Sequence, residues 1–214
     1  MQFELAGVMH CDPLGRERLL NWFHSLATQR PHLPRFVAVE WDPDRLPVDR
    51  ERQVVRTKLE ALPLPIDRDV IEALVKTVAL EADTHLPVYP TVETLWLDRF
   101  REIKDPSDVA MFADYRVEHY ASLLRMFASS RGRDLLESIS VFLWTNSLVS
   151  AAHGDDRDTA LAGAILHRSQ PFLIEPDAWA AVVLGTNHTR RDPGRVTTLL
   201  EQAGGICRVA DMRP

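Results

Sequence analysis

Two histidines occur in the same short motif near opposite ends of this 214-residue chain. One copy reads Gly7-x-x-His10 and the other reads Gly185-x-x-His188. With 9 glycines and 8 histidines, chance predicts only about a third of one such pair in the whole sequence. Each copy follows an apolar run and leads into Asp-Pro, Gly-Arg and a helix-like pattern. Because imidazole is a common ligand of divalent transition metals, the repeat predicts that both histidines reach one sheet edge and hold a metal ion.

A carboxylate is the third candidate, because Glu40 ends the apolar run Phe36-Val-Ala-Val-Glu40. A residue at the end of such a strand is largely buried, and burying a carboxylate without a partner is costly. We therefore expect a cation, either an arginine or a metal ion, against Glu40. The alternatives are that Glu40 caps a neighbouring helix or pairs with Arg45.

The fourth candidate is Arg157, near the start of a predicted helix. The helix dipole repels a cation there by a few tenths of a kcal/mol, so the position suggests a partner outside the helix. A salt bridge with the neighbouring aspartates 155, 156 and 158 is the alternative. Taken together, His10, Glu40 and His188 form a plausible set of ligands for a divalent metal, with positions left open for water and substrate.

The elements expected to position these residues define an α/β fold. Its central mixed sheet is built from the N- and C-terminal strands, and a large helical insert at about 49–170 separates them, within one domain of residues 1–214. Strands are predicted at 2–9, 35–42, 179–184 and 206–210. Helices are predicted from Asp12 to about Gln29 and at 49–62, 67–83, 91–103, 106–130, 133–148, 156–168 and 194–203. Residues 140–147 fit either a helix or a strand, and a helix is preferred.

The overall composition excludes several classes of function. A net charge of −6 argues against nucleic acid as a partner. No apolar run is long enough to cross a bilayer, and no secretory signal begins the sequence, so a cytoplasmic location is expected. We expect Cys11 and Cys207 to be reduced, although a single bridge between the terminal strands is the alternative. The sequence also lacks a His-Glu-x-x-His helix, a nucleophile elbow, a phosphate loop and a dinucleotide fingerprint.

The set of motifs resembles the Tiki/TraB superfamily, which includes the Tiki metalloproteases and the TraB/PrgY and GumN-like proteins. This superfamily is distantly related to the erythromycin-esterase and ChaN-like group. Besides the paired GxxH motifs, the carriers are Val39-Glu40-Trp41-Asp42 with Arg45, Arg157-Asp158, and the Ala160–Ile165 helix. Asp156 stands where the family commonly has Glu, and Trp41 replaces the more usual Leu. Residues 50–150 carry almost none of the resemblance.

The resemblance implies an α/β fold with both GxxH motifs at its active edge, a divalent metal such as manganese or cobalt, and peptide hydrolysis in the Tiki branch. The same ligands also suit zinc. We therefore expect a metal-dependent hydrolase of a peptide or small amide or ester. Glu40 would be a ligand or the general base, and Arg157 would stabilise an oxyanion or hold a substrate carboxylate. One alternative is a non-catalytic protein that sequesters a peptide, haem or metal. Another is an interaction protein whose GxxH turns are only structural.

Overall fold

The computed structural model describes residues 1–40, 48–97, 106–146, 154 and 156–214. Its centre is a five-stranded sheet in the order β3-β2-β4-β1-β5. The strands are β1 (Gln2–Val8), β2 (Val37–Val39), β3 (Thr94–Trp96), β4 (Trp179–Gly185) and β5 (Ile206–Ala210). Every pairing between them is parallel. All the strands therefore end at the same edge of the sheet, where ligand sites of open α/β sheets are found.

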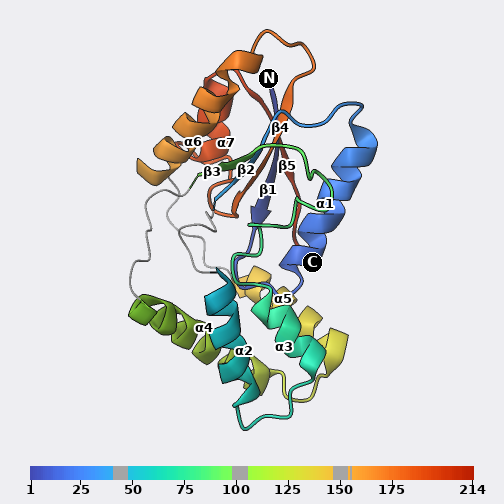
Figure 1. Cartoon of the computed structure of the whole chain (residues 1–214), viewed down its shortest axis with the longest axis vertical. Coiled ribbons are helices and arrows are strands. Elements are labelled where there is room, and N and C mark those ends of the chain that lie inside the picture. Colours follow the sequence, from blue (N-terminus) through green and yellow to red (C-terminus); the bar gives the residue numbers. More distant parts are fainter. Residues whose placement is uncertain (41–47, 98–105, 147–153, 155) are drawn as a thin grey trace.

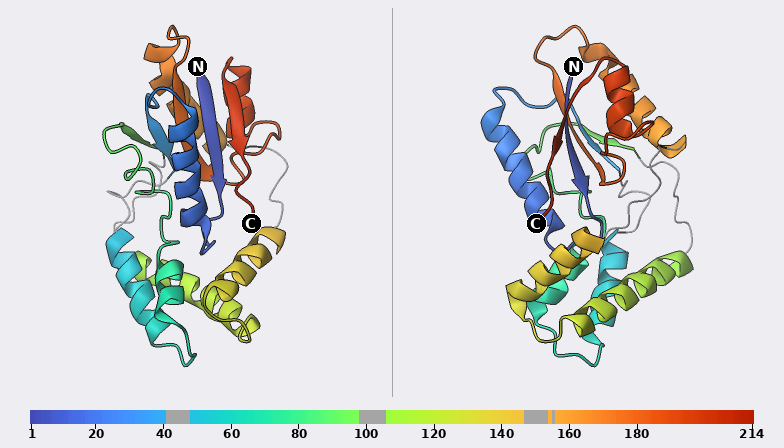
Figure 2. Two further views of the ribbon diagram at one scale, coloured as in Figure 1. Left: turned by 90° about the vertical axis from the view of Figure 1, so that its right-hand side faces the viewer. Right: turned by 180° about the vertical axis from the view of Figure 1, so that it is seen from behind.

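Helices cover both faces of the sheet (Figures 1 and 2). Alternate residues of β1 and β4 pack on α1 (Gly15–Gln29), through Leu19, Phe23 and Leu26. The opposite face packs on α6 (Asp156–Ser169) and α7 (Val196–Gln202). A short 3-10 turn, η1 (Gln170–Phe172), follows α6. Because both faces are covered there, the central strand β4 is apolar and buried along its whole length, as parallel strands usually are.

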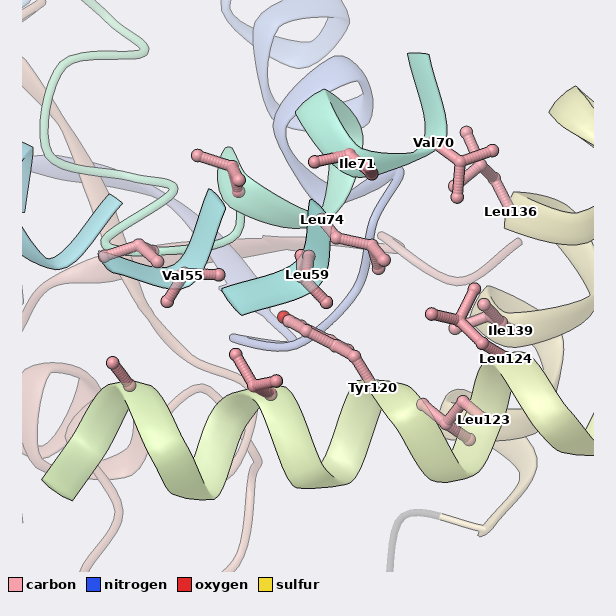
Figure 3. Close-up of a cluster of buried hydrophobic side chains, with 14 of the residues drawn as sticks. Val55, Leu59, Val70, Ile71, Leu74, Tyr120, Leu123, Leu124, Leu136 and Ile139 are labelled. Atoms are coloured by element: carbon pink, nitrogen blue, oxygen red, sulfur yellow. The ribbon is translucent and has the colours of Figure 1, made fainter. Parts of the chain in front are cut away.

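The remaining helices form a separate cluster beyond the carboxyl ends of the strands (Figure 1). They are α2 (Val48–Glu60), α3 (Arg68–Val75), α4 (Pro106–Met126) and α5 (Gly132–Asn146). The cluster has its own apolar core, in which Tyr120 of α4 lies among Leu59, Leu74 and Ile139 (Figure 3). Figure 3 shows side chains of several helices converging on this core. The turn after β1 and residues 78–82 also pack against it, which places the helices over the carboxyl edge of the sheet.

The predicted α/β class and its central sheet are confirmed, with one correction to the sheet. It is parallel rather than mixed, because helical or turn-rich crossovers connect the strands and return each one in the same direction. The insert also contributes to the sheet layer, since β3 extends the sheet and α6 covers it. The helical cluster outside the sheet layer is therefore built from α2 to α5 and covers fewer residues than the predicted insert at 49–170.

Two predicted helices are wrong in part. The range 91–103 contains β3, because Thr94, Leu95 and Trp96 pair with β2. Pairing with a neighbouring strand here overrides a weak local preference for helix. Residues 98–105 lie outside the described ones. The range 67–83 is helical only to Val75, after which successive turns run to residue 88. The strand predicted at 35–42 is shorter, Val37–Val39. Residues 140–146 are helical, as preferred.

Candidate metal centre

Three of the predicted site residues follow three adjacent strands. His10 comes after β1, Glu40 directly after β2, and His188 after β4, which lies between the other two in the sheet. The two GxxH turns are also bonded to each other, because the backbone N–H of Thr186 donates to the carbonyl of Val8 over 2.9 Å. The strand order therefore explains why residues far apart in the sequence converge at one edge.

Glu40 lies at the centre of the site and is only 2% exposed. Its Oε1 accepts a hydrogen bond from Nη2 of Arg157, and its Oε2 accepts one from the backbone N–H of Gly185 over 2.6 Å. Burial alone would raise the pKa of Glu40, but the charge that His10 carries when protonated, the charge of Arg157 and the Gly185 N–H lower it overall. Glu40 is therefore held as a carboxylate, and each of its oxygens accepts one hydrogen bond from the described residues, out of two lone-pair directions.

Each of the two imidazoles faces a different oxygen of this carboxylate. Nε2 of His10 is 3.9 Å from Oε2 of Glu40, and Nε2 of His188 is 3.8 Å from Oε1. Burial is the main cause that lowers the pKa of His10, and the negative charge of Glu40 opposes it. The His10 ring is therefore mostly neutral at neutral pH and can offer a nitrogen lone pair to a metal.

A buried aspartate fixes the orientation of His188. Oδ1 of Asp158 lies 3.0 Å from Nδ1 of His188 and also accepts the backbone N–H of Val196 over 3.2 Å. The other oxygen, Oδ2, pairs with Nη1 of the buried Arg195 at 3.1 Å. When Nδ1 of His188 donates to this carboxylate, the proton resides on Nδ1 and the lone pair on Nε2 faces Glu40.

A second buried acid lies behind His10. Oε1 of Glu81 is 3.7 Å from Nδ1 of His10, and the Glu81 side chain is fully buried. Burial, and then the nearby charge of Glu40, raise the pKa of Glu81 to about 8. Each imidazole of the site therefore has one nitrogen toward Glu40 and the other toward a separate buried carboxyl group.

Gly185 leaves room at the point where the three candidate ligands meet. A Cβ atom at this position would lie 2.9 Å from Nε2 of His10, 3.3 Å from Oε2 of Glu40 and 3.6 Å from Cδ2 of His188. Gly7 of the other motif is required for packing, because a Cβ there would lie 2.3 Å from Oγ1 of Thr189. One motif glycine thus permits close packing of the two turns, and the other keeps the space beside the ligands open.

The donor set suits a divalent metal in its chemistry, with two imidazoles and one carboxylate. Among the described residues, however, no group of three or more His, Cys, Asp or Glu side chains is arranged so that it could hold a metal ion. Two ligands of one tetrahedral ion lie about 3.4 Å apart, so binding would require the 3.8 and 3.9 Å separations from Glu40 to shorten by about half an ångström.

The structure brings together all four residues that the sequence singled out. Arg157 pairs with Glu40, so its partner lies outside its own helix, as expected from its poor local position. Asp42 and Arg45, together with Trp41, lie outside the described residues, as does Asp155. The pairing of Glu40 with Arg45 is therefore not described.

Two residues of the site, Asp158 and Glu81, are not predicted as site residues from the sequence. Asp158 is adjacent to Arg157, and on the first turn of one helix the two side chains reach different partners of the same site. The signal was the acidic residue next to the arginine, which was interpreted only as a neutraliser. The sequence indicates Glu81 only as a neighbour of His85 and Asp83, a group that is more simply explained as a solvated helix end, because its position at the site depends on turns that the pattern does not reveal.

Both cysteines are free in the structure. Cys11 follows His10 and packs against the helical cluster, whereas Cys207 is buried in the core between the sheet and α6 and α7. The expected reduced pair agrees with this placement, and the alternative bridge between terminal strands does not.

Comparison with known proteins yields no match: no protein-family model, no curated protein and no solved structure is similar to this chain. The resemblance to the Tiki/TraB superfamily rests on the motifs alone and stays a prediction. Within the described residues, no helix has both the length and the apolar character needed to cross a bilayer.

Proposed function

We propose that the chain is a metal-dependent hydrolase of the Tiki/TraB type, acting on a peptide or on a small amide or ester. The observation that carries the proposal is the convergence of two imidazole Nε2 atoms on one buried carboxylate, at the carboxyl edge of a parallel sheet. His10, His188 and Glu40 would hold a divalent ion, namely manganese, cobalt or zinc. When bound, such an ion is a Lewis acid that makes water acidic enough to supply hydroxide near neutral pH.

The protein's own groups have separate tasks in this proposal. Asp158 holds His188 with its Nε2 toward the site, and Gly185 keeps the reacting space open. Glu40 is a carboxylate that acts either as a ligand or as the acceptor of a proton from water. Arg157 is half-buried beside it, where its guanidinium can stabilise an oxyanion or hold a substrate carboxylate. A cytoplasmic compartment remains the expected setting.

One observation favours a non-catalytic alternative, in which the same pocket sequesters a peptide, haem or metal. Arg157 already occupies Oε1 of Glu40, and an arginine that stays paired with this acid competes with a metal for it. Turnover by the metal-loaded protein separates the two functions, because a sequestering protein binds its ligand but releases no product.

The first experiment is elemental analysis of the purified protein, followed by hydrolysis assays of the metal-loaded protein against peptide and ester libraries. His10→Ala and His188→Ala should each remove hydrolysis and weaken metal binding by at least about 100-fold, since each removes one of three ligands. His24→Ala is the matched control, because His24 is an exposed histidine of α1. Unchanged activity or metal content in either site variant would contradict the assignment.

A further inference from the structure

Glu81 is a buried carboxyl group whose position calls for a partner. Neither of its oxygens has a hydrogen-bond partner on another of the residues that the structure describes, although the backbone N–H of Glu81 itself interacts with the carboxyl group. Buried side-chain oxygens are nearly always hydrogen-bonded, because leaving one unsatisfied costs about 1–3 kcal/mol. The imidazole of His10 is the polar group that Oε1 faces, at 3.7 Å from Nδ1. This distance exceeds a hydrogen bond but can be closed by a small rotation of the His10 ring.

The segment that carries Glu81 is fixed by its surroundings. Oγ1 of Thr84 donates to the carbonyl of Leu80, and Nε2 of His85 lies 2.7 Å from Oγ1 of Thr94 in β3. Ala79, two residues before Glu81, has a φ of 46°, a left-handed conformation that is unfavourable for any residue with a side chain. The chain therefore adopts a strained backbone just where it directs a buried acid toward the site.

The environment of His188 shows what this acid can do. There, the Asp158 carboxylate contacts Nδ1 at 3.0 Å, while Nε2 faces Glu40. Glu81 has the same relation to His10, with the acid toward Nδ1 and Glu40 toward Nε2. A carboxylate behind a metal-binding histidine selects the tautomer and orients the ring, and its loss typically weakens metal binding 10- to 100-fold.

We propose that Glu81 is a positioning residue that accepts a hydrogen bond from Nδ1–H of His10 and thereby directs the Nε2 lone pair toward Glu40. Each histidine of the site then donates its Nδ1–H to its own buried acid, at 3.0 Å for His188 and Asp158 and from a starting distance of 3.7 Å for His10 and Glu81. The metal-binding consequence rests on the proposed function, whereas the hydrogen bond and the tautomer do not.

The tautomer can be measured without metal. In metal-free protein with ¹⁵N-labelled histidine, at a pH above about 9 where Glu81 is a carboxylate and can only accept, nitrogen chemical shifts should show His10 as the Nδ1–H tautomer. Glu81→Leu should convert His10 to a mixture or to the Nε2–H form, while His188 keeps its shifts as an internal control. An Nε2–H tautomer in the wild-type protein at this pH would overturn the proposal, because Nδ1 of His10 would then carry no proton to donate to the carboxylate. That wild-type spectrum is decisive even if Glu81→Leu fails to fold.

The second measurement is the affinity of the protein for manganese and for zinc, determined by calorimetric titration. Glu81→Leu should weaken binding 10- to 100-fold, and Glu81→Gln, which keeps an acceptor oxygen, should restore most of the loss. Asp83→Leu is the matched control, since it lies on the same segment but its side chain is 42% exposed. Equal losses in Glu81→Leu and Asp83→Leu would overturn the proposal. If the wild-type protein binds no metal, the proposed function fails, and the tautomer alone decides the role of Glu81.

Discussion

The two GxxH turns have nearly the same sequence plan but different surroundings. The side chain of His188 is 12% exposed, and its Nδ1 lies within hydrogen-bond distance of Asp158, which Arg195 and the Val196 N–H hold in turn. The side chain of His10 is 36% exposed, and its Nδ1 faces Glu81 from 3.7 Å. Repetition in sequence has therefore produced one histidine that is hydrogen-bonded to a buried acid and one that faces a buried acid from beyond hydrogen-bond distance.

This difference fits the geometry of the proposed centre. Because the ligand atoms must draw together around a metal, a site with both histidines fixed at 3.8–3.9 Å from Glu40 would resist binding. Under the proposed function, the side of His188 would be the rigid one that sets the position of the ion, and the side of His10 would be the adjustable one that closes on it. Variants that change each side separately test this difference.

The largest effect is expected from Asp158→Ala, which removes the support of the rigid side. The variant deletes a fully buried carboxylate that pairs with the buried Arg195, and breaking such a pair costs about 3–5 kcal/mol. The free energy of unfolding, from denaturant titration, should fall by this amount. Asp156→Ala is the control, because Asp156 lies exposed on the same helical turn and should cost only a few tenths of a kcal/mol. Equal stability of the two variants would show that the side of His188 is not specially held.

Substitution of the two motif glycines should separate packing from binding. Gly7→Ala forces a methyl group against Thr189 and the Cα of Thr186, and such overpacking costs about 1–3 kcal/mol. Gly185→Ala points its methyl group at the movable ring of His10, so stability should change by less than about 1 kcal/mol, while metal affinity falls at least about 10-fold.

Thermal unfolding and metal titration measure the two outcomes. Gly163→Ala is the control, because nothing lies near its added methyl group in α6, and a helix-interior alanine should stabilise the protein by about 0.5–1 kcal/mol. If Gly185→Ala bound metal as tightly as Gly163→Ala, the space beside Gly185 would not be the metal position.

The features that were predictable from sequence are those encoded locally. The apolar runs ending in Gly7-x-x-His10 and Gly185-x-x-His188 are strands, and parallel strands end at one edge, so the convergence of the two histidines followed from the motifs. Glu40 was marked by its place after an apolar strand, and Arg157 by its position at a helix start. Each of these signals lies within a segment of about ten residues: a charged residue in an unfavourable local position, or one copy of the repeated motif.

The features that were not predictable depend on contacts between distant segments. β3 is three residues long and exists because it pairs with β2, so its sequence alone does not specify it. The turns after Val75 replace a helix because residues 78–82 pack between the sheet edge and the helical cluster. Glu81 could therefore not be placed, and the acid behind His10 becomes visible only in three dimensions.

The smallest expected effect concerns His85, which helps to hold the adjustable side. Burial lowers the pKa of His85 to about 4, and the charge of Asp83 opposes this only in part; Thr94 and the ring of Phe23 are its other neighbours. The unfolded chain has an ordinary histidine pKa of about 6.5, so between these values the unfolded state binds a proton that the folded state does not. The stability that a neutral His85 preserves is complete at pH 7 and is lost as the pH falls toward 4.

The measurement is the free energy of unfolding at pH 7 and pH 5 for the wild-type protein and for His85→Gln, which stays neutral at both. Other acids titrate in both proteins alike, so the wild type should lose about 1–2 kcal/mol more than the variant. Equal losses in the two proteins would remove His85 as a fixed point of the segment that carries Glu81.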